Sequence, residues 1–163
     1  MSDLAFLSSG AARAGDGFEP RAASPLARAL EGARGLRDLS LLGKVEVRDG
    51  AVDGLPADVE VLRITARRAL LVCPAERCAE LLESQSGFAV DLSGALAGIE
   101  VEGAELMRRL TDLDLSELPA TGKVAGVPAL VAASGGDRYR IFFPQEYGHS
   151  VVETVRDLQD GVA

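Results

Sequence analysis

The sequence predicts an α+β fold built from two similar halves, and three observations support this prediction. The tripeptide Asp-Leu-Ser occurs at 38–40 and again at 91–93, each time shortly before a stretch in which polar and apolar residues alternate. A strand that runs into a proline and then a helix occurs at 69–83 and again at 139–155. These features follow the same order in both halves, and each helix has one apolar face that a shared sheet must bury.

The domain organisation follows from composition. An Ala/Gly/Ser-rich stretch without a clear period predicts a flexible tail at 1–23, followed by one folded domain at 24–163. The two halves of this domain are expected at about 36–87 and 88–160. The tail lacks the basic start and long apolar run of a secretory signal, and no stretch approaches the length of a membrane span. A soluble, cytoplasmic protein is therefore expected.

The first half is predicted to begin with a short helix. Ser24 followed by Pro25 is typical of a helix start, and the apolar spacing that follows predicts a helix ending near Gly35. Lys44 to Arg48 alternates strictly between polar and apolar residues, which predicts a half-buried strand. The elements that follow are strands at 59–65 and 67–73, and a helix that starts at Pro74 and is capped at its C-terminus by Gly87.

The second half has the stronger strand signals. Its predicted elements are a strand region at 91–102, a helix at 104–113, an extended stretch at 123–133, a hairpin loop at 134–137, a strand at 138–143, and a final helix from Tyr147 to Gly161. Phe142 falls on the same strand face as Arg138 and Arg140. An aromatic side chain on a polar face is either covered by another element or part of a partner surface.

Charge and metal-ligand counts exclude two classes of function. The chain has 17 Lys and Arg against 25 Asp and Glu, a net charge of −8, so no nucleic-acid partner is expected. A structural zinc site needs four Cys or His ligands, and the chain contains only Cys73, Cys78 and His149. No metal site is expected. The two cysteines are interpreted as small buried apolar side chains, with a disulfide between them as the alternative.

Few side chains suggest catalysis. Asp112 and Asp114 could pair as an acid and a base, but at a helix exit they point in different directions, which favours a solvated turn. His149 has no Ser or Cys nucleophile motif around it, and Ser150, its chain neighbour, would not face it on a helix. The residues alone therefore assign no catalytic, cofactor-binding or metal-binding side chain.

Three stretches carry a resemblance to a known family. Residues 35–50 resemble the D-x-S-x-L-G-K-x-x-V-x-G stretch of the folate-binding fold, which the glycine-cleavage T-protein shares with its iron–sulfur-assembly relative and sarcosine oxidase. Residues 101–119 resemble the family's G-x-x-A-x-x-L-x-x-L-x-x-x-D-L helix. Residues 126–158 resemble the closing hairpin and helix, most closely those of the sarcosine oxidase gamma subunit. The resemblance covers about 36–158.

This resemblance implies two intertwined lobes, each an antiparallel or mixed sheet with a packed helix, no C-terminal barrel domain, and a role in one-carbon metabolism. The aspartate of the family's G-x-x-D-D-L strand has no counterpart in Gly126–Leu130, and the K-G-C-Y-x-G-Q-E motif is absent. Both departures indicate the gamma-type branch: a non-catalytic subunit of a sarcosine oxidase-like complex. Such a subunit has no cofactor of its own, and larger partner subunits carry the flavin and folate.

Two alternatives stay open. One is a small tetrahydrofolate-dependent aminomethyl or methyl transferase with its pocket between the lobes. The other is a stand-alone binding module, because fold does not fix function. The pairs Arg67-Arg68 and Arg108-Arg109 could hold the glutamate tail of a folate, since Arg recognises carboxylates bidentately, but surface charges are the favoured interpretation.

Overall fold

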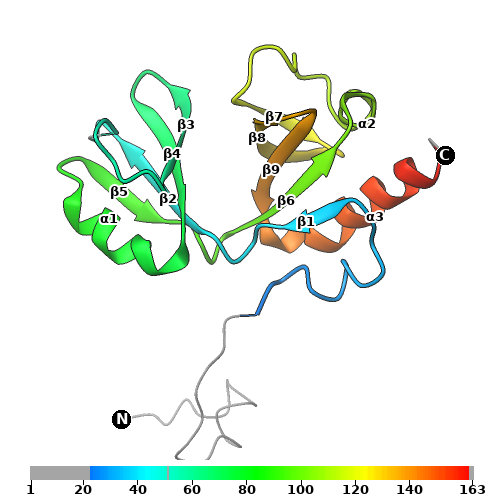
Figure 1. Ribbon diagram of the computed structural model, residues 1–163, viewed down its shortest axis with the longest axis horizontal. Coiled ribbons are helices and arrows are strands. Elements are labelled where there is room, and N and C mark those ends of the chain that lie inside the picture. The colour runs from blue at the N-terminus through cyan, green and yellow to red at the C-terminus, as the bar shows by residue number, and fades with distance from the viewer. Residues whose placement is uncertain (1–22, 51, 162–163) are drawn as a thin grey trace, which may run out of the picture.

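The computed structural model describes residues 23–50 and 52–161, and all but the last residue of the predicted tail at 1–23 lies outside them. Within these residues the predicted α+β class is confirmed, with three α-helices and two antiparallel sheets (Figure 1). The sheets and their helices form two lobes that lie side by side (Figure 1).

The first lobe is a four-stranded sheet with one helix. In spatial order its strands are β3 (Glu60–Thr65), β4 (Arg68–Cys73), β2 (Gly43–Arg48) and β5 (Phe88–Asp91). A 3-10 turn at Ala75–Arg77 leads from β4 into α1 (Cys78–Ser84). This strand, proline and helix sequence agrees with the prediction.

The second lobe is a five-stranded sheet with two helices. Its strands in spatial order are β1 (Leu36–Asp38), β6 (Leu96–Glu102), β9 (Arg138–Pro144), β8 (Val127–Gly135) and β7 (Ala120–Val124). The helix α2 (Ala104–Leu110) follows β6, and a 3-10 turn at Gln145–Tyr147 leads from β9 into α3 (Gly148–Asp160).

The halves are intertwined because each gives one edge strand to the other lobe. The strand β1 comes first in the chain but pairs with β6, whereas β5 pairs back with β2. Leu39 N donates to the Gly98 carbonyl at 2.8 Å, and Leu92 N donates to the Lys44 carbonyl at 2.7 Å. The two Asp-Leu-Ser tripeptides thus carry the chain from one lobe into the other, which confirms the expected intertwined architecture.

The hydrophobic core has three parts. One apolar cluster lies between α2, α3 and the second sheet, and another lies between α1 and the first sheet. The third lies between the two sheets and joins the lobes; its buried members are Leu39, Leu62, Leu70, Val72, Leu130, Ala132 and Phe142. Of the two possibilities for Phe142, the structure shows that another element covers it: the residue is 1% exposed and packs against the first lobe.

The strand predicted at 44–48 is confirmed within β2, but the prediction that it is half-buried was wrong. Lys44 is fully buried and Glu46 is 4% exposed, although both lie on the polar face of the strand. The pattern correctly separated two faces of the strand. The polar face is nonetheless buried, because the second sheet covers it.

Four other predictions also differ from the structure. Residues 25–32 form consecutive turns instead of a helix, because Gly32 adopts a φ of 73° and the segment is too short for a cooperative helix. Ser24 Oγ still caps the segment by accepting a hydrogen bond from Leu26 N at 3.0 Å. Gly87 is not a helix cap: a Cβ there would lie 2.6 Å from the Arg48 carbonyl, so close backbone packing explains the glycine.

The extended stretch at 123–133 is in fact a hairpin between β7 and β8. Ala125 and Gly126 adopt φ values of 51° and 79°, as a two-residue type I′ turn requires. Alanine rarely adopts such a φ, so this turn could not be recognised from its residues. The helix at 104–113 ends at Leu110, because Thr111 returns to an extended conformation and its hydroxyl donates to the Lys123 carbonyl at 2.7 Å.

Candidate functional site

The main candidate site is a cavity of about 480 Å³ between the lobes. Its walls are mainly apolar and come from both halves of the chain; they include Ile64, Leu70, Leu92, Leu96, Leu130 and Phe142. The polar side chains that reach it are Glu46, Arg68, Thr121 and Lys123. Apolar walls with a few polar groups are typical of small-molecule sites at domain boundaries.

Glu46 is the buried charge on the first-lobe side of this cavity. Its carboxylate accepts a hydrogen bond from Arg68 at 2.6 Å and another from Arg48 at 2.8 Å. Burial by itself would raise the pKa of Glu46, but the hydrogen bonds from the two guanidinium groups outweigh it, so the pKa is lowered. The carboxylate is therefore ionised and fully paired at neutral pH, and the positive side chains that line the cavity are Arg68 and Lys123.

A second cavity, of about 520 Å³, lies on the other side of the junction between the lobes. The internal repeat relates the two cavities. Leu92, Leu96, Phe142, Phe143 and Pro144 line the first, and their counterparts Leu39, Leu42, Val72, Cys73 and Pro74 line the second. The remaining walls differ: the second cavity is bordered by Arg37, Asp58, Glu60 and Arg140 and is therefore ionic.

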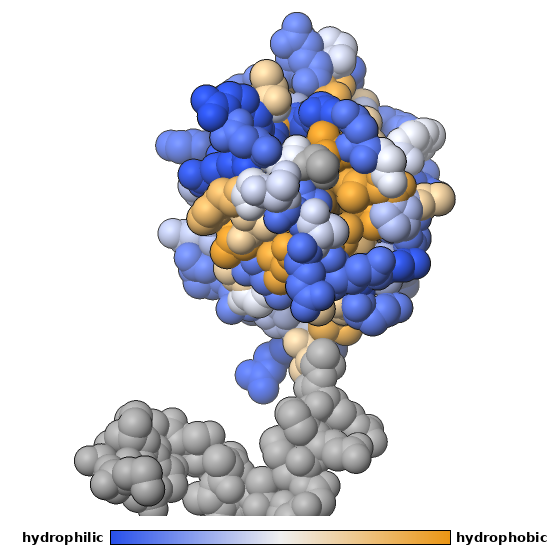
Figure 2. Space-filling model, turned by 90° about the vertical axis from the view of Figure 1, so that its left-hand side faces the viewer, coloured by the Kyte–Doolittle hydropathy of each residue, from blue (hydrophilic) through white to orange (hydrophobic). Residues whose placement is uncertain are grey.

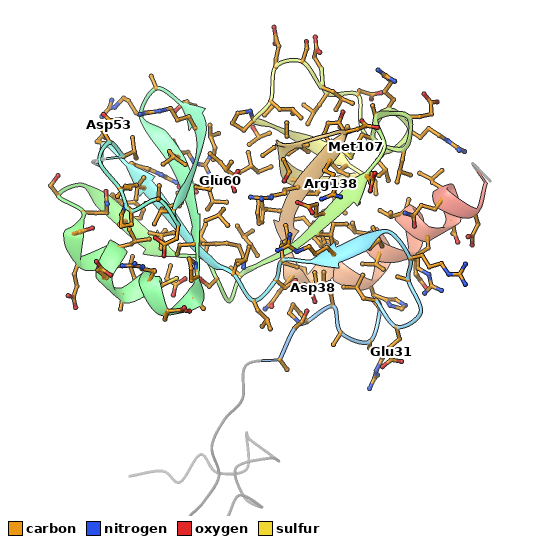
Figure 3. The ribbon with its side chains drawn as sticks, in the orientation of Figure 1. Glu31, Asp38, Asp53, Glu60, Met107 and Arg138 are labelled. Atoms are coloured by element: carbon orange, nitrogen blue, oxygen red, sulfur yellow. The ribbon has the colours of Figure 1, made fainter. Side chains whose placement is uncertain are left out.

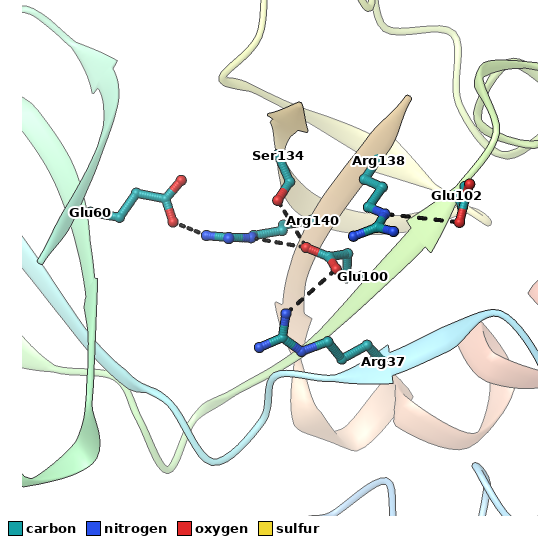
Figure 4. Close-up of polar contacts among 7 residues, drawn as sticks. All are labelled: Arg37, Glu60, Glu100, Glu102, Ser134, Arg138 and Arg140. Atoms are coloured by element: carbon teal, nitrogen blue, oxygen red, sulfur yellow. Dashed lines mark hydrogen bonds and ion pairs between the residues drawn. The ribbon is translucent and has the colours of Figure 1, made fainter. Parts of the chain in front are cut away.

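An ionic network joins the lobes at the second cavity (Figure 4). Glu60 lies on the side of β3 that faces the second lobe, and it pairs there with Arg140 of β9 (Figure 3). The Arg140 guanidinium also lies 3.3 Å from Glu100, a buried carboxylate that accepts a hydrogen bond from Ser134 at 2.9 Å. Arg37 completes the cluster at 3.7 Å from Glu100. Glu100 of β6 occupies the position that Glu46 occupies in β2.

Lys44 is a buried cation at the crossing point between the lobes. Its Nζ donates to the carbonyls of Ser40 and Leu42, at 2.8 Å and 2.6 Å. Burial lowers the pKa of Lys44, and nearby Cys78 and Asp91 partly oppose this shift. Its role is therefore to hold the loop that follows the first Asp-Leu-Ser.

The side chains singled out in the sequence do not meet in one place. Asp114 accepts hydrogen bonds from the backbone and hydroxyl of Ser116, at 2.9 Å and 2.7 Å, as in a solvated turn, and its pKa is lowered by them. His149 lies on the exposed face of α3, 3.1 Å from Glu153. Asp112 is exposed, and Ser150 donates to the Tyr147 carbonyl.

The pairs Arg67-Arg68 and Arg108-Arg109 do not form a common binding site. Arg67 forms an exposed bidentate pair with Asp49, and Arg108 lies 3.6 Å from Glu105 on the surface of α2. Arg68 alone among these four lines the apolar cavity. No local signal would have identified the site, because the alternation of Lys44, Glu46 and Arg48 shows a polar strand face but not which element covers that face.

The burial predicted for Cys73 and Cys78 is confirmed. Both are free thiols, 2% and 8% exposed. Among residues 23–50 and 52–161, no group of three or more Cys, His, Asp or Glu side chains is placed to hold a metal ion. None of the helices in the same residues is both long and apolar enough to cross a membrane.

Comparisons with known proteins establish the fold. No protein-family model matches the chain. No curated protein matches it either. Among solved structures, the chain is similar to a chain of the heterotetrameric sarcosine oxidase from Corynebacterium sp. U-96, in complex with pyrrole 2-carboxylate. The TM-score is 0.69 at 20% identity, over 86% of this chain and 95% of that chain.

A second similarity is weaker. The regulatory subunit of aspartate kinase from Thermus thermophilus, in its ligand-free form, matches with a TM-score of 0.50 at 13% identity, over 76% of this chain and 97% of that chain. The fold shared with the sarcosine oxidase chain is the one that the sequence resemblance predicted.

Proposed function

We propose that this chain is a non-catalytic, gamma-type subunit of a sarcosine oxidase-like complex that uses flavin and folate in one-carbon metabolism. The observation that carries the proposal is the fold, which matches 95% of one chain of a heterotetrameric sarcosine oxidase. In this role the chain stabilises larger subunits that hold the flavin and folate, and it has no cofactor of its own. A cytoplasmic location is proposed with it, since free thiols suit a reducing compartment.

The outer face of the first lobe supports a role in an assembly. Figure 2 views this lobe from outside and shows apolar side chains gathered at its centre, among hydrophilic ones. The half-buried apolar residues that pack on this lobe's core are Val52, Leu55, Val61, Leu82 and Ala89. The corresponding face of the second lobe is covered by α2 and the longer α3. An apolar patch of this kind is typical of a protein-binding surface.

The test is affinity purification of the tagged chain from its native host, followed by mass spectrometry and a visible spectrum. Co-purification of a larger subunit with flavin absorption is the expected result. Leu82→Glu should release that subunit, whereas Tyr147→Glu, an equally apolar-to-charged change on the second lobe, should retain it. A colourless, solitary chain would refute the proposal. Circular dichroism of both variants establishes that they are folded.

The alternative function is tetrahydrofolate binding, by a small transferase or a stand-alone binding module. The observation that favours it is the apolar cavity, where Arg68 and the exposed amine of Lys123 could meet carboxylates. A ligand at a hundred times its Kd stabilises a protein by about 2.7 kcal/mol, so tetrahydrofolate should raise the melting temperature. Leu96→Trp, which fills the cavity, should abolish the rise, and an unchanged wild-type melting temperature would exclude this function.

A further inference from the structure

Two free thiols meet where β4 passes into α1. Cys73 is the last residue of β4 and Cys78 is the first residue of α1. Their Sγ atoms are 4.0 Å apart, and Pro74 and the 3-10 turn lie between the two residues. A disulfide bond is about 2.05 Å long, so the sulfurs need to approach by about 2 Å. We propose that Cys73 and Cys78 are an oxidisable dithiol that a small hydroperoxide converts into an intramolecular disulfide.

The facing strand leaves space for the two sulfurs. Gly43 of β2 lies against both of them: a Cβ at this position would overlap Cys78 Sγ and would lie 2.8 Å from Cys73 Sγ. The Pro74 carbonyl would be 3.2 Å from the same Cβ. The sulfurs thus occupy a pocket that exists because residue 43 has no side chain.

The other half of the chain shows that the fold does not need cysteine at these positions. Pro74 corresponds to Pro144, so Cys73 and Cys78 correspond to Phe143 and Gly148 at the junction between β9 and α3. There the space is filled by Leu26, which packs directly on the Cα of Gly148. The same junction is therefore well packed with no sulfur, and space filling alone does not explain two cysteines in contact.

The surroundings give the two thiols different roles. Burial and the neighbouring Cys78 raise the pKa of Cys73 to about 12, so Cys73 stays protonated at neutral pH. Cys78 is the more exposed of the two, and it lies close enough to the Lys44 ammonium group to oppose the lowering of that group's pKa. Cys78 is therefore assigned as the sulfur that attacks the oxidant, and Cys73 as the sulfur that resolves the product. The 520 Å³ cavity is lined by Cys73, and Cys78 Sγ lies 4.0 Å from the sulfur of that residue.

The chemistry balances in two steps. The Cys78 thiol attacks one oxygen of hydrogen peroxide, the O–O bond breaks, and a sulfenic acid and one water are formed. The Cys73 sulfur then displaces the hydroxyl of the sulfenic acid, which forms the S–S bond and releases a second water with the Cys73 proton. In total, two thiols lose two electrons and two protons, and one peroxide is reduced to two waters.

The test uses the whole reduced chain and hydrogen peroxide as the probe. Trypsin cleaves after Arg68, Arg77 and Arg108, so Cys73 and Cys78 fall on the separate peptides 69–77 and 78–108. After oxidation and alkylation, these two peptides should be found joined, and a reducing agent should separate them. Peptides that are both alkylated, that carry sulfinic or sulfonic acid, or that join different copies of the chain would overturn the proposal.

Two variants test the assigned roles. In Cys73→Ser, peroxide should leave a sulfenic acid on Cys78 that a dimedone reagent captures. In Cys78→Ser, capture at Cys73 should be at least tenfold lower, because burial, the largest cause of the raised Cys73 pKa, remains in this variant and leaves little thiolate. Equal or reversed capture would overturn the roles. Thermal melting of both variants confirms that they are folded, and the wild-type peptide test stands without them.

Discussion

Phe142→Ala should destabilise the protein strongly, because Phe142 is the largest apolar side chain between the two sheets. Its ring is 1% exposed and is so close to β6 that a Cβ on Gly98 would lie 2.9 Å from it. A buried Phe removes roughly 150–250 Å² from water. At about 25 cal/mol per Å² the smaller area corresponds to about 4 kcal/mol, within the usual range for Phe→Ala in a core.

Urea denaturation followed by circular dichroism measures this change. With a slope of roughly 2 kcal/mol per M, a loss of about 4 kcal/mol lowers the midpoint by about 2 M, with the slope itself unchanged. The control is Phe88→Ala: Phe88 is 58% exposed, and the guanidinium carbon of Arg48 lies 5.4 Å from the centroid of its ring. Removal of the Phe88 ring should lower the free energy of unfolding by about 1 kcal/mol or less. Equal midpoints for the two variants would refute the argument that the lobes are held together by a buried apolar cluster.

Three further predictions concern the charges and the close contacts. The lowered pKa of Glu46 stabilises the fold above its unfolded value near 4.5, and this contribution is lost as the pH falls through the folded value. Glu46→Gln should therefore be less stable than the wild type at pH 7. The urea midpoints of the two proteins, measured at decreasing pH, should approach each other, and a difference that stays constant with pH would contradict the prediction. Gly43→Ala should lower the melting temperature sharply and cost about 1–3 kcal/mol by overpacking, whereas Gly94→Ala, with open space around its Cα, should be neutral. Arg140→Ala should lower the free energy of unfolding, measured by urea denaturation, by about 1–3 kcal/mol, because Glu60 and the buried Glu100 lose their shared cation. A change below about 0.5 kcal/mol would mean that the network does not stabilise the fold.

Local sequence patterns predicted most elements correctly. The strand at Arg138–Pro144 and the helix at Gly148–Asp160 agree with the prediction to within a few residues. Alternation and helical periodicity reflect the geometry of a single element, so they can be recognised without its neighbours. The failures lie where local signals were weak, as at the turn of Ala125 and Gly126 and in the short segment after Pro25.

The candidate site was less predictable than the fold. The cavity between the lobes takes its walls from strands of both halves, and no short motif marks them. Arg68 is next to Arg67 in the chain, but Arg67 points elsewhere and binds Asp49. Arg140 is one of two charges on a strand face, and its partner Glu60 is 80 residues away in the chain. Pairings over such distances depend on how the lobes are placed.

The sequence by itself determined the repeated order of strand, proline and helix and the two Asp-Leu-Ser tripeptides, but it did not predict the edge strands β1 and β5, and the strand region expected at 91–102 is the end of β5, a loop and β6. Only the tertiary structure decided what these tripeptides do: they exchange β1 and β5 between the lobes and turn the two sheets face to face. Ser40 contacts Gly98 across 58 residues, and the polar face of Lys44 and Glu46 becomes an inner wall. The physical reason is that a period of two shows that a strand has two different faces, but what covers each face depends on distant parts of the chain.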